Sequence, residues 1–150
     1  MAHELRTRRR VEFAETDCAG IIHFSNYFRY MEEAEHAFLR SVGLSVQSRI
    51  EEGELGFPRL AASCEFLRPV KFEDVLDVHL RVKRKGRTSL TYTVVFAKDG
   101  LEVARGQTTA VACLCRPDHT FEPIPLPRDI AERIEEAPPH PAPGDEGRPR

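Results

Sequence analysis

Residues 15–41 have the sequence ETDCAGIIHFSNYFRYMEEAEHAFLRS, in which a turn-rich segment leads directly into the strongest helix signal of the chain. From Tyr27 onward, apolar residues recur at steps of three and four, and charged residues occupy the opposite face. This pattern predicts an amphipathic helix of about four turns with one buried stripe. Ser25 or Asn26 is expected to cap its first turn, and Gly43 suits the left-handed residue that follows a helix.

The segments around this helix alternate with a period of two, as half-buried strands do. The strands predicted from them comprise residues 6–13, 62–70, 76–83, 90–96 and 101–115. Pro69 favours a sheet edge or a bulge, and Asp99-Gly100 predicts a tight hairpin. A short helical turn is expected at 46–52, a loop at 53–58 and a terminal helix at 129–136. One strand, one long helix and four closely spaced strands predict an α+β domain with an antiparallel sheet packed on the helix.

The bulk properties indicate one domain of about residues 1–137, followed by a Pro-rich tail at 138–150 that is expected to be disordered. A net charge of −2 gives no reason to expect nucleic-acid binding. No stretch approaches the roughly 20 apolar residues of a membrane span, and the first residues lack the apolar core of a signal peptide. The four cysteines form no C-x-x-C pair, so free thiols and a cytoplasmic location are expected.

Asp17 is the carboxylate with the clearest chemical potential, because it precedes the predicted helix by only one short loop. A helix N-terminus offers unpaired N–H groups that can stabilise an oxyanion, and a nearby carboxylate can act as base or nucleophile. The competing interpretation is that Asp17 merely closes an Asx turn, as most Asp-x-x-Gly segments do. The spacing alone does not decide between the two.

Two motifs resemble those of hotdog-fold acyl-CoA thioesterases, in particular the 4-hydroxybenzoyl-CoA thioesterase-like family. The first is Phe13-x-Glu-Thr-Asp-x-x-Gly-x-x-x-Phe-x-Asn-Tyr-x-x-Tyr-x-Glu32, and the second is Arg68-Pro-Val-Lys-Phe-Glu-Asp74. The resemblance covers about residues 8–116. It implies a curved five-stranded antiparallel sheet wrapped around one long helix, and an acyl-CoA thioesterase that hydrolyses an acyl or aroyl thioester. It also implies a homodimer, or a tetramer of two dimers, with active sites at the dimer interface.

The resemblance implies a role for each matching position. The catalytic carboxylate would be Asp17, and the amide that polarises the thioester carbonyl would lie at Phe24 or Ser25, with His23 beside it. Expected substrate contacts are Gly20, Asn26, Tyr27 and Tyr30, together with a basic hairpin for the coenzyme A phosphates that contains Lys85, Arg87, Thr88 and Ser89. A solvated turn that protects the sheet edge explains this hairpin equally well. A thiolate leaves readily because a thiol pKa lies near 8.5, so a single carboxylate without a partner acid is adequate. No metal or organic cofactor is expected. The sequence permits either direct attack by Asp17 or activation of a water.

Several alternatives stay open at this level. Helix glutamates Glu32, Glu33 and Glu35 are backup candidates for the catalytic carboxylate, although a solvated helix face explains them better. Cys113, Cys115 and His119 supply too few ligands for a zinc site. A hotdog hydratase or dehydratase could use Asp17 with His23, and a non-catalytic acyl-thioester-binding protein would show the same fold.

Overall fold

The computed structural model describes residues 1–140 of the 150-residue chain. In chain order its elements are β1 (Glu4–Arg10), the 3₁₀ turn η1 (Phe13–Glu15), α1 (Ser25–Ser41), β2 (Ser48–Ile50), β3 (Gly53–Gly56), β4 (Arg59–Phe66), β5 (Val75–Lys85), β6 (Ser89–Lys98), β7 (Leu101–Val111), β8 (Cys113–Cys115), β9 (Phe121–Pro123) and α2 (Arg128–Arg133). Among these residues, neither helix combines the length and hydropathy that a bilayer crossing requires.

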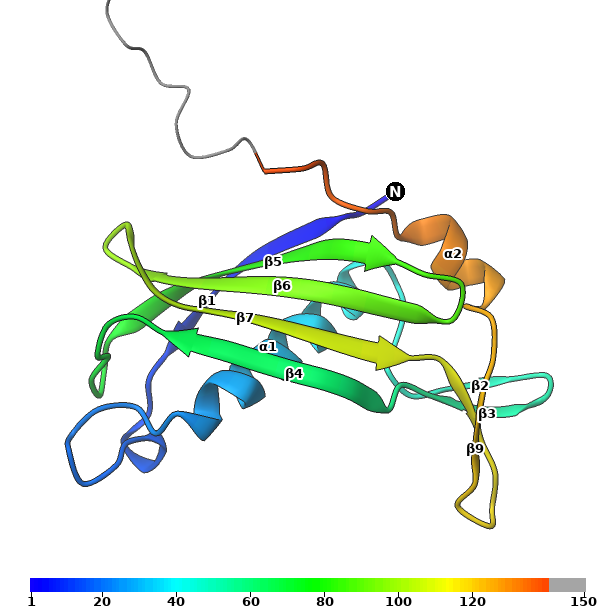
Figure 1. Cartoon of the computed structure of the whole chain (residues 1–150), viewed down its shortest axis with the longest axis horizontal. Coiled ribbons are helices and arrows are strands. Elements are labelled where there is room, and N and C mark those ends of the chain that lie inside the picture. Colours follow the sequence, from blue (N-terminus) through cyan, green and yellow to red (C-terminus); the bar gives the residue numbers. More distant parts are fainter. Residues whose placement is uncertain (141–150) are drawn as a thin grey trace, which may run out of the picture.

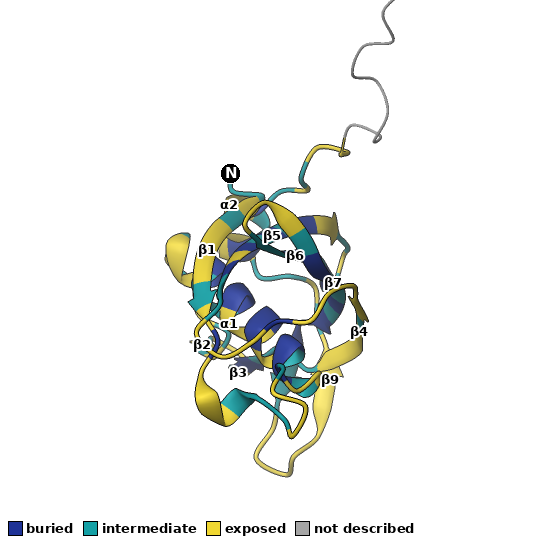
Figure 2. Ribbon diagram, turned by 90° about the vertical axis from the view of Figure 1, so that its left-hand side faces the viewer, coloured by how far each residue is buried: buried dark blue, intermediate teal, exposed yellow. Residues whose placement is uncertain are grey.

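The main sheet has five antiparallel strands in the order β1-β5-β6-β7-β4. It curves around α1, which lies along its concave face (Figures 1 and 2). Buried residues line the inside of this wrap, whereas the outer surface is mostly exposed or half-buried (Figure 2). The predicted α+β architecture, with one long helix in a curved five-stranded sheet, is therefore confirmed.

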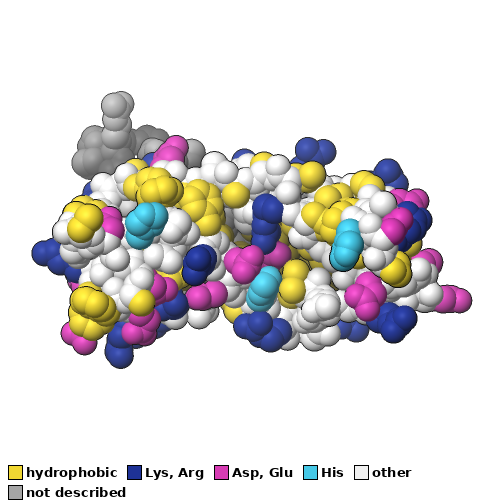
Figure 3. Space-filling view, turned by 90° about the horizontal axis from the view of Figure 1, so that it is seen from below, with side chains coloured by type: hydrophobic (Ala, Val, Ile, Leu, Met, Phe, Trp, Pro, Cys, Tyr) yellow, Lys and Arg dark blue, Asp and Glu magenta, His cyan; other side chains and the backbone are white. Residues whose placement is uncertain are grey.

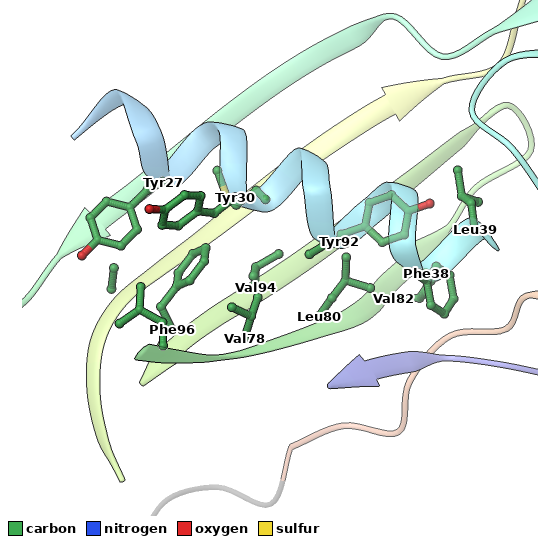
Figure 4. Close-up of a cluster of buried hydrophobic side chains, with 14 of the residues drawn as sticks. Tyr27, Tyr30, Phe38, Leu39, Val78, Leu80, Val82, Tyr92, Val94 and Phe96 are labelled. Carbon is green, nitrogen blue, oxygen red and sulfur yellow. The ribbon is translucent and has the colours of Figure 1, made fainter. Parts of the chain in front are cut away.

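The core forms because two periodicities meet across the same interface. From Leu76 to Val82 in β5 and from Leu90 to Phe96 in β6, every second residue points inward and is buried, as the alternation of apolar residues predicts. These residues pack against the apolar stripe of α1, as Figure 4 shows. The rings of Tyr27 and Phe96 meet edge to face with centroids 5.2 Å apart, and those of Phe38 and Tyr92 with centroids 6.0 Å apart. The long helix is thus fixed at both ends against the middle of the sheet.

The two ends of α1 differ from each other in how well the sequence predicts them. Gly43 has φ +75° and follows the helix as expected, and the N–H of Leu44 returns to the carbonyl of Leu39 at 2.8 Å. At the other end, the expected side-chain caps are wrong. Ser25 is already the first helical residue, and the N-cap position falls on Phe24, which has no side-chain capping bond.

The chain also contains a second sheet, in the order β2-β3-β8-β9, that the sequence analysis missed. Residues 46–52 were expected to form a helical turn and 53–58 a loop, but they contain β2 and β3. The expected last strand at 101–115 is interrupted at Ala112, after which β8 leaves the main sheet and pairs with β3. Strands of three or four residues carry too little periodicity to be recognised locally, and the pairing of β3 with β8, which completes this sheet, joins residues about 60 positions apart.

Other boundaries shift by a few residues. The first strand ends at Arg10, so Phe13 lies in η1 and is exposed rather than part of a buried strand face. The edge strand β4 begins at Arg59 and ends before Pro69, and its edge position is as predicted. Asp99 and Gly100 both have positive φ, as a tight hairpin requires. The predicted disordered tail falls largely outside the described residues.

Candidate active site

Asp17 lies in a tight turn that joins two short antiparallel segments. The N–H of Gly20 donates to the carbonyl of Asp17 at 3.0 Å, and the N–H of Asp17 donates to the carbonyl of Ile21 at 2.9 Å. Gly20 has φ +77°, the conformation that follows a type I turn in a three-residue hairpin loop. On its far side the loop is anchored to the connection between β4 and β5, because the N–H of Ile22 donates to the carbonyl of Val70 at 2.8 Å.

The Asp17 carboxylate takes part in an Asx turn and still has a free oxygen. Its Oδ1 accepts from the N–H of Ala19 at 2.8 Å, as the structural interpretation of this residue predicts. Within residues 1–140, Oδ2 has no hydrogen-bond partner from the protein. The turn therefore fixes the direction of the carboxylate while leaving one oxygen available.

The start of α1 presents a free amide beside this carboxylate. The N–H of Asn26 donates to the carbonyl of His23, and the N–H of Ser25 approaches His23 Nδ1 at 3.3 Å. The N–H of Phe24 has no acceptor in the described part of the chain. Among the N–H groups of residues 24–26, Phe24 is therefore the free donor at a position where the helix dipole favours negative charge.

Asp17 and Phe24 line the same cavity, which has a volume of about 430 Å³. Its wall is mostly apolar and comes from the Asp17 loop, the first turn of α1 and the end of β4, namely Asp17, Ile21, Ile22, Phe24, Tyr27, Phe66, Leu67, Arg68 and Pro69. In the view from below, hydrophobic side chains gather toward both ends of this side of the molecule (Figure 3). A cavity with one carboxylate, one free amide and an apolar wall can hold and activate an acyl group.

A polar network under the loop holds Asp17 and α1 together. The main-chain carbonyl of Glu15 accepts from the N–H of His23 and from Asn26 Nδ2, both at 2.8 Å. The Glu15 carboxylate accepts from the hydroxyl of Tyr30 at 2.7 Å and from the guanidinium of Arg9 at 2.8 Å. Burial, reinforced by the Glu15 contact, raises the pKa of Tyr30 and keeps its hydroxyl protonated as a donor.

The remaining residues predicted around Asp17 divide between the cavity and this network. Tyr27 lines the cavity, and burial raises its pKa to about 12. Asn26 and Tyr30, which were expected to contact substrate, point to Glu15 instead. The His23 ring stacks on Phe24 at 4.7 Å, and its Nδ1 lies 2.7 Å from Ser25 Oγ. His23 thus supports the helix start and makes no hydrogen bond to Asp17 within the described residues.

The predicted phosphate-binding hairpin lies far from Asp17 within one chain. The turn between β5 and β6 is at the α2 end of the sheet, and the Asp17 loop is at the opposite end (Figure 1). Lys85 Nζ donates to the carbonyls of Ala131 and Ile134, both at 2.8 Å, and thereby holds α2. The main-chain carbonyl of Ser89 accepts from the N–H of Gly86, and that of Thr88 accepts from the N–H of Ala112. The side chain of Arg87 is exposed.

The end of β4 contributes cavity residues that the sequence analysis did not assign to the site. Phe66 and Leu67 are exposed large apolar residues, at 50% and 41%, and both line the cavity with Arg68. Their signal in the sequence is their place directly before the Arg68–Asp74 motif.

The helix glutamates also differ from expectation, because Glu35 is buried whereas Glu32 and Glu33 are exposed. Cys18, Cys64, Cys113 and Cys115 are free thiols, and residues 1–140 contain no cluster suited to a metal.

Comparison with known proteins agrees with this geometry. Residues 19–104 match the thioesterase superfamily. A 1,4-dihydroxy-2-naphthoyl-CoA hydrolase of Thermosynechococcus vestitus is 34% identical over 87% of this chain and 90% of its own length. A 4-hydroxybenzoyl-CoA thioesterase of Pseudomonas is 31% identical over 59% of this chain and 64% of its own. The crystal structure of a 1,4-dihydroxy-2-naphthoyl-CoA thioesterase from Synechocystis superposes with a TM-score of 0.76 at 26% identity, covering 87% of this chain and 94% of that one. The chain therefore belongs to the thioesterase superfamily, has its hotdog fold and is a thioester hydrolase.

Proposed function

We propose that this protein hydrolyses an acyl- or aroyl-CoA thioester to the free acid and coenzyme A, with Asp17 as the catalytic carboxylate. The observation that carries the proposal is the shared cavity, in which Asp17 has a free Oδ2 and Phe24 has a free N–H. The names of the relatives, which act on aroyl-CoA esters, support the same class of substrate.

In this mechanism the thioester carbonyl accepts a hydrogen bond from the Phe24 N–H at the start of α1. That donor is part of the main chain and does not reorganise as negative charge develops on the oxygen. Asp17 then either attacks the carbonyl carbon to give an acyl anhydride, which water hydrolyses, or removes a proton from an attacking water. In both routes the C–S bond breaks and coenzyme A leaves as a thiolate, which needs little acid assistance.

Two copies of the chain are proposed to join along β4. Within residues 1–140 this strand pairs only with β7, and its exposed apolar residues include Leu60 at 66% and Phe66 at 50%. A free edge with exposed apolar residues favours pairing with another strand. Antiparallel pairing of β4 with its copy would place the α2 end of the partner beside the Asp17 end of this chain. The basic hairpin of the partner is thus a candidate for binding the coenzyme A phosphates.

A cytoplasmic location is also proposed, and the four free cysteines support it.

The test is thiol release from a panel of acyl- and aroyl-CoA esters by the wild type, by Asp17→Asn and by Cys18→Ser. Asp17→Asn keeps the size of the side chain but removes its charge, and turnover is expected to fall at least about 10²-fold. Cys18 is an exposed neighbour in the same turn, so its substitution is expected to leave turnover unchanged. Turnover that survives Asp17→Asn would move the catalysis elsewhere. A wild type that binds the esters without releasing thiol would indicate a non-catalytic binding protein.

A further inference from the structure

The Asp17 cavity is open on the side where β4 ends. Phe66 and Leu67 line it and are exposed, although Phe66 faces the concave side of the sheet together with the buried Ala104 of β7. In the described part of the chain, β4 forms a free edge of the sheet (Figure 1). The missing wall of the cavity therefore depends on what covers this edge, which in the proposed dimer is a second copy of the chain.

The symmetry of a β4–β4 contact restricts which part of the partner lies at the opening. Residues directly opposite each other in antiparallel strands share a face of the sheet. A symmetric pairing that overlaps residues 59–66 completely therefore has its two-fold axis at Ala62 or at Ser63, and not between them. In both registers the first residues of one β4 lie opposite the last residues of the other.

Arg59 of the partner subunit is placed beside the Asp17 cavity by either register. It lies opposite the end of β4 in this chain, within residues 64–67, and paired Cα atoms are about 4.5–5.5 Å apart. Because the two-fold axis is perpendicular to the sheet, the concave faces of both copies point the same way. The beginning of the partner's β4 thus adjoins the cavity on its open side.

The partner brings a buried ion pair to this position. Glu35 on α1 is 1% exposed and pairs with Arg59, whose side chain is 29% exposed. A carboxylate buried so deeply requires a charged partner. The register between β4 and β7 shifts between Arg59 and Ala61, as at a β-bulge, and bulges redirect side chains. Arg59, at the beginning of an edge strand, is thus directed toward α1 on the concave face.

A small cavity beside the ion pair contains a further polar group. Its volume is about 170 Å³, and its lining includes Arg59, Ala62 and Thr108. Thr108 is buried, and its Oγ1 has no hydrogen-bond partner among residues 1–140. The surface at the beginning of β4 is therefore polar, whereas the wall of the Asp17 cavity at the end of β4 is mostly apolar.

We propose that Arg59 and Glu35 of the partner subunit close the Asp17 cavity, so that each active site is built from two chains and excludes long alkyl groups. The thioester carbonyl lies at the N–H of Phe24 in one chain, and the acyl group extends from it toward the partner's ion pair. The inference rests on the proposed thioesterase function and adds to it the residues that limit the length of the acyl group.

An ion pair is a poor wall for an alkyl chain. A methylene that replaces water beside Arg59 or Glu35 offers them no hydrogen bond, which costs free energy. Against an apolar wall the same methylene would stabilise the complex. A short acyl group ends before the pair and avoids this cost, whereas a longer one must displace the pair or leave its own end in water.

The first test compares kcat/KM for butanoyl-CoA and decanoyl-CoA in the wild type and in Glu35→Leu/Arg59→Met. The double variant leaves no unpaired charge, and apolar side chains of similar volume often replace a buried ion pair without loss of stability. The wild type is expected to prefer butanoyl-CoA by at least about tenfold, and the variant to hydrolyse decanoyl-CoA at least about tenfold better than the wild type does. Thr108→Val, which removes only a hydroxyl, is expected to shift the preference in the same direction and serves as the second variant if the first does not fold.

Mixed dimers show whether the ion pair acts on its own chain or on the partner. Chains with Asp17→Asn and chains with Glu35→Leu/Arg59→Met are coexpressed with different affinity tags and purified through both tags. The one intact Asp17 then belongs to the chain without the ion pair, and it faces the native Arg59 of the other chain. We expect the wild-type preference for butanoyl-CoA to return. The preference of the double variant would show that the pair acts within its own chain and would overturn the inference.

Other outcomes separate this inference from the proposed function. Equal kcat/KM for the two esters in the wild type would overturn the ion-pair wall while the thioesterase function stands. A wild type that sediments as a monomer while it hydrolyses the esters would do the same. If no ester is hydrolysed, the proposed function fails and equilibrium binding decides, because the ion-pair wall predicts that the double variant binds decanoyl-CoA more tightly than the wild type does. Equal binding would overturn it.

Discussion

The side-chain amide of Asn26 donates to the main-chain carbonyl of Glu15 at 2.8 Å, which joins the first turn of α1 to the segment that leads into Asp17. Phe24, whose amide is free, is two positions from Asn26 in the sequence, and Asp17 is two positions from Glu15. The relative position of the two groups therefore depends on a contact that neither of them makes.

Asn26→Ala is expected to lower kcat by about tenfold with little change in KM. The substitution removes one of the two donors to the Glu15 carbonyl, and the N–H of His23 keeps that carbonyl from being left unpaired. The free energy of unfolding should fall by only about 1 kcal/mol, because one hydrogen bond is lost. Steady-state kinetics and urea unfolding measure the two effects. An unchanged kcat together with the expected stability loss would limit Asn26 to a role in folding.

Arg9→Lys is expected to lower the free energy of unfolding by about 1–2 kcal/mol. The guanidinium contacts the carboxylates of Glu15 and Glu33 at 2.8 and 2.9 Å and lies 4.5 Å above the ring of Tyr30. Lysine cannot reproduce this fork or the stacked contact. Glu33→Gln is the control, because Glu33 is half exposed and its pair should contribute less than about 1 kcal/mol. Equal losses of unfolding free energy in the two variants would show that the contact of Arg9 with the less exposed Glu15 adds no stability beyond its contact with Glu33.

Asp74→Asn is expected to show a stability loss that depends on pH. Burial alone would raise the pKa of Asp74, but hydrogen bonds from Lys98 Nζ and the N–H of Lys71 outweigh it and lower the pKa below the ordinary 3.8. A lowered carboxylate pKa stabilises the folded state above the ordinary pKa, and the effect is lost as pH falls through the folded value. The difference between wild type and variant should therefore be about 1 kcal/mol at pH 7 and should shrink below about pH 4.

Urea unfolding between pH 2.5 and 7 would measure this effect. Asp77→Asn serves as its control, because the Asp77 pair with Arg8 is largely exposed and should contribute little at any pH. A stability difference for Asp74→Asn that stays constant across the pH range would contradict the ionic origin of the effect.

Gly106→Ala is expected to destabilise the protein by about 1–3 kcal/mol, the usual cost of overpacking. A Cβ at this position of β7 would lie 2.2 Å from Met31 Sδ and 3.1 Å from the carbonyl oxygen of Ser63. Because Met31 is the closest obstacle, the double variant Gly106→Ala/Met31→Ala should lose less stability than the sum of the two single variants. Additive losses would show that the Ser63 carbonyl, rather than the α1 contact, sets the limit.

The sequence by itself determined the features that a short window encodes. The three- and four-residue spacing after Tyr27 predicts α1, and the alternation along β5 and β6 predicts their buried faces, since both depend on backbone geometry within one element. Gly43 and Asp99-Gly100 likewise occupy the positive-φ positions that their stereochemistry suits. The role of Asp17 as catalytic carboxylate stays a prediction, made from its place before α1 and from the family resemblance.

The tertiary structure alone decided which surfaces meet. Glu35 has the sequence position of a solvated helix glutamate, yet β4 covers it and Arg59 pairs with it. Phe66 enters the Asp17 cavity because the sheet closes over α1 at the point where β4 ends. The pairing of β3 with β8 joins segments that no local pattern relates. In each case the free energy comes from contacts between residues far apart in the chain, and a local sequence window does not contain both partners.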